Sequence, residues 1–183
     1  DLLAHHGIEP PALSALEEGL QALEAGRLDA AQRLLDAALV EEPGNPRAIV
    51  GLARLAAARG DTEAARRQLE RLSEDQQQGA DAASIKAWLA FNDLIAAGPP
   101  PQTLQDMLEK WPDDLEARFR LAIWRLLGGD AEAAIEALLA IMQKDRKFHD
   151  DGARKTLLQI FDYLGKEHPL ARKARARMAM LLN

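Results

Sequence analysis

The chain has 183 residues and a formal net charge of −6, and aromatic residues make up 4% of it. It contains no cysteine, which excludes disulfides, thiol catalysis and cysteine-based metal sites within the chain. No apolar run approaches the ~18 residues of a membrane span, and the acidic balance argues against general nucleic-acid binding.

The first segment, residues 1–11, predicts the end of a helix followed by a linker. Gly7 closes the helical pattern, and Pro10-Pro11 stiffens the connection. Because the chain begins with Asp1 and not with a methionine, we expect it to be part of a longer protein. No signal-peptide pattern stands at this end, so we expect a cytoplasmic location.

Residues 12–45 predict two helices joined by a tight turn. Leu16, Leu20 and Leu23 recur at helical spacing before Gly26, and a second run ends at Pro43. A shift of 34 residues places Gly26 on Gly60, which is the period of a tetratricopeptide repeat. One such unit cannot bury its apolar face alone, so we expect neighbouring units to stack on it.

The remaining chain continues this pattern. Further repeats are expected at residues 46–78, 79–112 and 113–149, of which the third is irregular because three prolines interrupt it at 99–101. Residues 150–183 predict two helices without the repeat's small residues, as expected of a terminal cap. The predicted fold class is therefore all-α: a tetratricopeptide-type solenoid of about four repeats plus a C-terminal capping helix pair.

The first helix of each repeat is expected to line the concave face through its second, fifth, ninth and twelfth places. The apolar residues at these places predict a groove that binds client segments of other proteins. The alternative is that a tight solenoid fills its own groove with its capping helices. The groove residues are Leu13, Leu16, Leu20, Leu23, Val50, Ile85, Trp88, Ile95, Phe119, Ile123 and Leu126.

The last helix is the second candidate site. Residues 147–183 carry a net charge of +4, which leaves −10 on the rest of the chain. On a helical wheel an apolar arc from Leu170 to Leu182 should pack on the solenoid. A partner-docking face is predicted from the other side chains, namely Arg172, Lys173, Arg175, Arg177 and Met180. The alternative is a solvated basic face that complements the helix dipole.

No catalytic residue, metal site or cofactor is predicted. His5 and His6 are adjacent and so point to different faces of a helix, whereas metal pairs on helices need a spacing of three or four. Near His149, the residues Asp150 and Asp151 predict an N-cap rather than a ligand set. The carboxylate pairs are sequence neighbours without a common cleft, so we expect a protein that is not an enzyme.

The C-terminal region resembles the bacterial YbbN/CnoX family of thioredoxin-fold proteins with a tetratricopeptide region, also called chaperedoxins. The resemblance is carried by Asp151-Gly152-Ala153-Arg154-Lys155-Thr156-Leu157, Phe161, Leu164-Gly165, Pro169-Leu170, Arg175, Arg177 and Leu181-Leu182. It extends over residues 12–183 and implies that residues 1–7 end a preceding thioredoxin domain. This chain has neither that domain nor its cysteines.

The resemblance implies a holdase that binds unfolded or oxidation-damaged client proteins and passes them to the chaperonin GroEL/GroES and to DnaK. It also implies chaperonin docking by the last helix, Pro169 to Asn183. The alternative is a passive scaffold that links fixed partners in a bacterial assembly. Neither membrane nor nucleic acid is expected among the partners.

Overall fold

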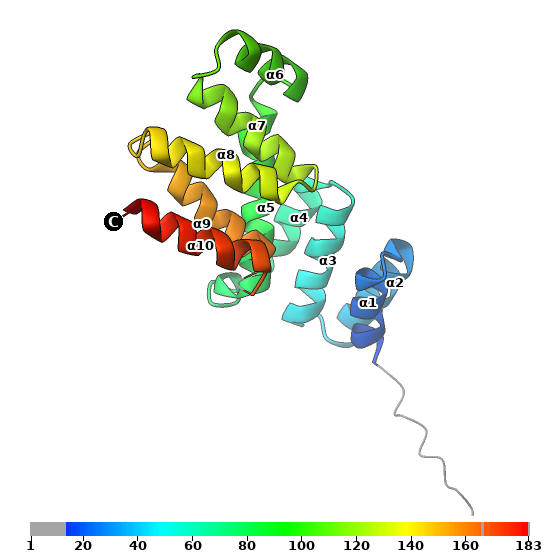
Figure 1. The fold of residues 1–183 in the computed structure, drawn as a ribbon. Coiled ribbons are helices and arrows are strands. Elements are labelled where there is room, and N and C mark those ends of the chain that lie inside the picture. Colours follow the sequence, from blue (N-terminus) through cyan, green and yellow to red (C-terminus); the bar gives the residue numbers. More distant parts are fainter. Residues whose placement is uncertain (1–13, 166, 183) are drawn as a thin grey trace, which may run out of the picture.

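The computed structural model describes residues 14–165 and 167–182, and these residues form ten α-helices and one short 3₁₀ turn (Figure 1). The α-helices are α1 (Ala15–Glu24), α2 (Leu28–Glu41), α3 (Pro46–Ala58), α4 (Thr62–Glu70), α5 (Ala80–Ala96), α6 (Pro101–Lys110), α7 (Leu115–Leu127), α8 (Ala131–Lys144), α9 (Gly152–Leu164) and α10 (Pro169–Leu182). The 3₁₀ turn is η1 (Gln76–Gln78). The all-α prediction is confirmed.

Polar caps and glycines set most helix ends. At α1 the Ser14 hydroxyl accepts from the Glu17 N–H at 3.3 Å, and the Glu17 carboxylate accepts from the Ser14 N–H at 3.0 Å. Carboxylate or amide oxygens also cap α3, α4, α7 and α8, from Asn45, Asp61, Asp114 and Asp130. The turns after α1, α3 and α7 need φ values of +70°, +74° and +93°, which Gly26, Gly60 and Gly129 supply.

The first four helices stack as two antiparallel pairs, with α3 against both α1 and α2. Small residues permit this close packing. A side-chain carbon placed on Gly51 of α3 would lie 3.1 Å from Leu20 on α1 and 3.1 Å from Leu35 on α2. The buried Ala22 and Ala31 belong to the same contact. The regular small residues of the first repeat are therefore used for stacking.

Helix α5 is shared by two hydrophobic cores. Ile85 and Leu89 on one side pack with α3 and α4, whereas Ala87 and Phe91 on the other side pack with α7, α8, α9 and α10. Phe91 is fully buried and meets the Tyr163 ring of α9 edge to face, with 6.0 Å between ring centroids. The irregular third repeat thus has α9 as the main neighbour of its long helix, while α6 packs against α7.

The C-terminal helices cover the second half of the stack. In Figure 1, α9 and α10 lie over the second half of the stack; α9 contacts α5 and α8, and α10 contacts α8 and α9. Helix α10 is buried through Ala171, Ala174 and Met178, whereas Leu182 at its end is 45% exposed. The predicted packing arc is therefore correct in its middle and too long at its end.

The predicted aspartate stands at the N-cap of α9, as Asp151, but its side chain does not cap the helix. His149, Asp150 and Asp151 all have left-handed backbones, with φ between 50° and 65°, and Asp151 makes no cap hydrogen bond from its side chain. This turn directs the two carboxylates to side chains: Asp150 pairs with Lys155 at 2.9 Å, and Asp151 pairs with Arg154. Both carboxylates in this loop are therefore held by ion pairs, and neither supplies a side-chain cap bond to the helix.

Candidate protein-binding groove

An open groove crosses the inner side of the first half of the stack. It consists of two adjoining hollows of about 330 and 480 Å³ that share Arg54, Ala80 and Asp81. The first lies between α1, α3 and the start of α5, and the second continues to the end of α9. The concave surface is therefore open from α1 to α5.

The wall formed by α3 presents alternating charged and apolar side chains. Val50 follows Arg47 by three residues and Arg54 follows Val50 by four, so all three lie on one face of the helix. Leu20 of α1 and the bare backbone of Gly51 complete the apolar part of this wall. The first hollow therefore offers an apolar centre between two guanidinium groups.

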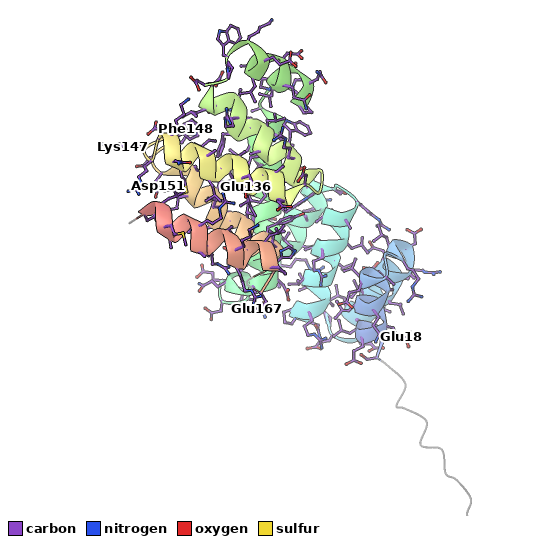
Figure 2. The ribbon with its side chains drawn as sticks, viewed as in Figure 1. Glu18, Glu136, Lys147, Phe148, Asp151 and Glu167 are labelled. Atoms are coloured by element: carbon purple, nitrogen blue, oxygen red, sulfur yellow. The ribbon has the colours of Figure 1, made fainter. Side chains whose placement is uncertain are left out.

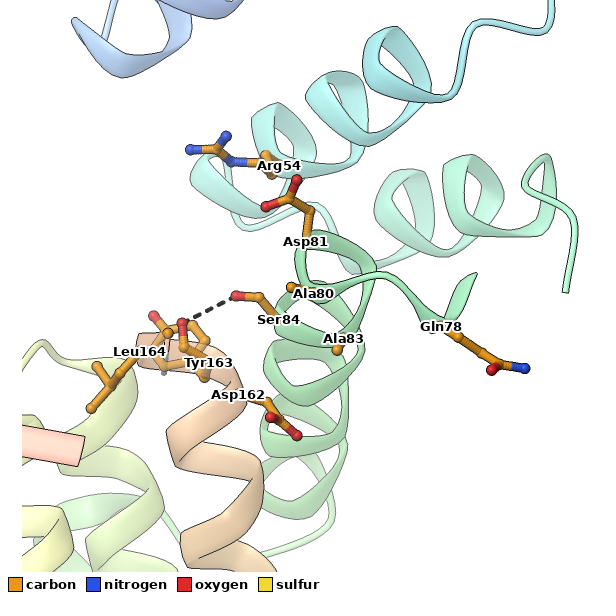
Figure 3. A pocket seen from close by; sticks show the side chains of 10 residues that line it. Arg54, Gln78, Ala80, Asp81, Ala83, Ser84, Asp162, Tyr163 and Leu164 are labelled. Carbon is orange, nitrogen blue, oxygen red and sulfur yellow. Dashed lines mark hydrogen bonds between the residues drawn. The ribbon is translucent and has the colours of Figure 1, made fainter. Parts of the chain in front are cut away.

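The charges of the two walls are opposite. Arg47 and Arg54 are exposed and form no ion pair with any of the described residues, whereas Asp81 of α5 and Asp162 of α9 line the other side. In Figure 3 the Arg54 guanidinium is directed away from the Asp81 carboxylate. Hydrogen bonds from Ser14 hold the pKa of the Glu17 carboxyl below its usual range, and the charge of Arg47 adds to this.

A hydrogen bond fixes the far end of the groove. The Ser84 hydroxyl on α5 donates to the Tyr163 carbonyl on α9 at 3.1 Å, as the dashed line in Figure 3 shows. Helix α9 then ends at Gly165, whose φ of +91° suits glycine. This contact holds the last turn of α9 beside the first turns of α5, where the second hollow lies.

Several predicted groove residues lie inside the core. Ile85, Phe119, Ile123 and Leu126 are at most 5% exposed, so they do not line an open surface. The last three pack in one cluster with α9, which covers this half of the concave face. The groove is therefore filled by α9 in the second half of the stack and open in the first half.

The other predicted groove residues are dispersed. Leu20 and Val50 line the groove, Leu16 is half-buried on α1, and Leu23 packs between α1 and α2. Trp88 packs on the core between α3 and α5, and Ile95 lines a separate hollow of about 410 Å³ with Thr62 and Trp124. Leu13 lies outside the described residues.

The predicted register of α5 is one residue too late. Ser84, Ala87 and Phe91 face α9, whereas the repeat positions predict Ile85 and Trp88 on the inner side. The apolar character of α5 on both sides hides the correct register. Asp81 and Ser84 were therefore missed as groove residues, although their spacing from Ala87 and Phe91 is helical.

Two of the predicted docking residues on α10 are engaged inside the molecule. Arg177 pairs with both carboxylate oxygens of Glu136 on α8, labelled beside α10 in Figure 2, and the second bond is 2.8 Å long. This bond holds the pKa of Glu136 below its usual range. Arg175 lies over the Phe161 ring, 4.9 Å from its centroid. Arg172, Lys173 and Met180 remain exposed, Met180 by 75%.

The described residues contain no helix long and apolar enough to cross a membrane. Within the same residues, no three histidine or acidic side chains cluster as metal ligands would. The geometry instead offers a surface groove with an apolar centre and charged sides. Such a groove suits the side chains of another polypeptide.

Comparisons with known proteins agree with this architecture. Two tetratricopeptide-repeat family models match the chain, one over residues 22–89 and the other over residues 95–183. A crystal structure of a domain of a Vibrio parahaemolyticus protein of unknown function is similar, with 23% identity and a TM-score of 0.43 over 93% of this chain and 99% of that chain. A search of curated proteins finds no match.

The two repeat-family matches and the ten described α-helices confirm the predicted fold class, a tetratricopeptide-type helical-repeat solenoid. Stacked repeats of this type form extended concave surfaces that bind other proteins. The chain is accordingly a protein–protein interaction module.

Proposed function

We propose that this helical-repeat solenoid is the protein-holding module of a chaperone or co-chaperone. The observation that carries the proposal is the open groove, in which Leu20 and Val50 lie beside Arg47 and Arg54, two arginines that form no ion pair with a described residue. Apolar surface of this kind is what a holdase offers to an unfolded segment. The groove is short, so we infer that it holds one extended segment of a client at a time.

The resemblance to the YbbN/CnoX family supports the chaperone role but does not explain the contact with clients. Leu157 and Phe161, which carry part of the resemblance, are buried in the core, and Arg154 pairs with Asp151. These residues build the α9 cap. The resemblance therefore supports a shared packing of the C-terminal helices and not a shared client-binding surface.

Suppression of aggregation tests the holding role. The 183-residue chain is mixed with a heat-denatured model protein, and light scattering is followed. We expect Leu20→Ser combined with Val50→Ser to abolish most of the suppression, because both remove apolar surface from the groove. Val40→Ser is the matched control, since Val40 is 83% exposed on α2 outside the groove. Unchanged suppression by a folded double variant would refute the role of the groove.

We further propose that α10 docks on a chaperone partner, with the chaperonin GroEL and DnaK as candidates. Arg172, Lys173 and Met180 form the exposed face that supports this. Arg172→Glu combined with Lys173→Glu should weaken capture of the chain by purified GroEL. Arg33→Glu combined with Arg67→Glu carries the same change in charge on exposed positions of α2 and α4 and should have no effect. Equal capture of both variants would remove the docking role.

The shortness of the groove also favours a second candidate, a scaffold that links fixed partners. A scaffold would bind one defined segment and would leave aggregation of unrelated proteins unchanged. The scattering assay with several unrelated model proteins separates the two functions. Suppression of all of them by the wild-type chain supports holding, and suppression of none supports scaffolding.

A further inference from the structure

We propose that the groove selects extended segments in which an apolar residue is flanked on both sides by acidic residues at alternate positions, acid–x–apolar–x–acid. This inference rests on the proposed function, since it specifies which segments the groove holds. It arises from the arrangement of Arg47, Val50 and Arg54 along α3.

Arg47 and Arg54 differ from neighbouring arginines because they form no ion pair with a described residue. Arg59 pairs with Asp29 at 2.8 Å, and Arg66 pairs with Asp93 at 2.5 Å, both across adjacent helices. Arg47 and Arg54 make no such pair among the described residues and line the groove on either side of Val50. Two guanidinium groups in a chain of net charge −6 give this wall a local positive charge that a carboxylate can complement.

The separation of Arg47 and Arg54 along α3 is similar to the span of five residues in an extended peptide. Seven residues of α-helix separate the α-carbons of Arg47 and Arg54 by about 10 Å. In an extended peptide the side chains of alternate residues point the same way, so positions one, three and five lie on one face over about 13 Å. Arginine side chains are long enough to bridge this difference. The two acidic residues therefore reach Arg47 and Arg54, and the central residue lies over Val50.

The first hollow has room for the central side chain of the segment. Leu20 and Val50 are only half-buried, so the first hollow has an apolar floor beside α3, and Leu20 and Leu35 fill the space beside the Gly51 backbone. The neighbouring Ala80 and Ala82 at the start of α5 are small. A leucine-sized side chain removes apolar surface from water there without displacing a charged group.

The opposite wall fixes which face of the segment is acidic. Asp81 and Asp162 line the α5 and α9 side, and their negative charge repels carboxylates directed to them. The acidic face of the segment must therefore face α3. Asp81 lines both hollows together with Arg54, so its negative charge weakens the attraction of Arg54 for a carboxylate of the segment. Neutralising Asp81 should strengthen binding.

Fluorescence anisotropy with labelled, end-blocked peptides tests the selection. The probe is Gly-Ser-Glu-Ser-Leu-Ser-Glu-Ser-Gly, and the comparison probes replace both glutamates by glutamine or by lysine. We expect the glutamate probe to bind about tenfold more tightly than the glutamine probe, as two exposed ion pairs allow, and the lysine probe to bind least. The preference should decrease with added salt.

Variants of the chain assign the preference to the groove. Arg47→Ala combined with Arg54→Ala should remove the tenfold preference, and Asp81→Asn should increase affinity for the glutamate probe about twofold to threefold. Arg33→Ala combined with Arg67→Ala is the matched control and should retain the preference, because both residues are exposed outside the groove. Circular dichroism confirms that each variant is folded.

The outcomes separate this inference from the proposed function. Equal binding of the glutamate and glutamine probes, or a preference that survives loss of Arg47 and Arg54, overturns the acidic selection. Aggregation suppression that still depends on Leu20 and Val50 would then leave the holding role standing. If the Leu20/Val50 variant and the Arg47/Arg54 variant both suppress aggregation as well as the wild-type chain does, the proposed function itself is refuted.

Discussion

Replacing Phe91 by alanine should destabilise the second half of the stack far more than the first. Phe91 is fully buried on α5 and contacts the Tyr163 ring of α9. A buried Phe→Ala change costs about 3–5 kcal/mol through lost burial and the cavity that remains. For a chain of this length each 1 kcal/mol lowers the Tm by roughly 2–4 °C, so we expect a decrease of about 6–20 °C.

Urea unfolding measures the loss, and hydrogen exchange locates it. Exchange should accelerate most in α9 and α10, which share the core of Phe91, and least in α1 and α2. Leu94→Ala on the same helix is the control, because Leu94 is 37% exposed, and we expect it to cost less than about 1 kcal/mol. A cost below about 1 kcal/mol for Phe91→Ala, or equal acceleration of exchange in α1 and α9, would refute the assignment of Phe91 to the second core.

Three further changes test other contacts. Gly51→Leu should lower stability by about 1–3 kcal/mol and reduce peptide binding, because the new side chain meets Leu20 in the groove; urea unfolding and anisotropy measure both effects. The Glu136–Arg177 pair should stabilise α10 fully above the usual glutamate pKa and lose this effect as the pH falls through the lower pKa of the folded state, so Glu136→Gln should weaken the acid sensitivity of exchange in α10. Gly60→Ala should cost about 1 kcal/mol in a thermal melt from its φ of +74° alone, since no atom lies within 4 Å of the added carbon.

The local structure was predictable because local chemistry sets it. Asp61 caps α4 and Pro46 begins α3 through effects that act within one helical turn, so both helix starts follow from the local sequence. The turn at Gly26 likewise follows from the need for a left-handed residue. The period of 34 residues then implies the stacking of the first repeats.

The extent of the open groove could not be predicted in the same way. Phe119 and Ile123 are apolar at groove positions whether solvent or α9 covers them, so their sequence pattern cannot distinguish the two cases. The cover comes from a helix far along the chain. The groove charges were predictable in part, because Arg47 and Arg54 occupy the expected inward positions, but Asp162 reaches the groove only through the packing of α9.

The Arg177–Glu136 pair was missed for a similar reason. On a helical wheel Arg177 lies opposite the apolar arc, which favours a solvent-facing side chain. The wheel contains no information on α8, whose Glu136 reaches the same edge of α10. Fewer basic side chains are therefore available for docking than the net charge of residues 147–183 suggests.

The return of α9 onto α5 limits how this array can vary in length. An open solenoid can gain or lose terminal units, because each unit depends only on its neighbours. Here α9 leaves that linear order and packs on α5, four helices earlier, where Ala87 and Phe91 share one core with it. An insertion of one more repeat between α5 and α9 would separate surfaces that now complete each other. The C-terminal pair thus fixes the number of repeats in the second half of the stack. Among the described residues, no helix folds back in this way onto α1 and α2.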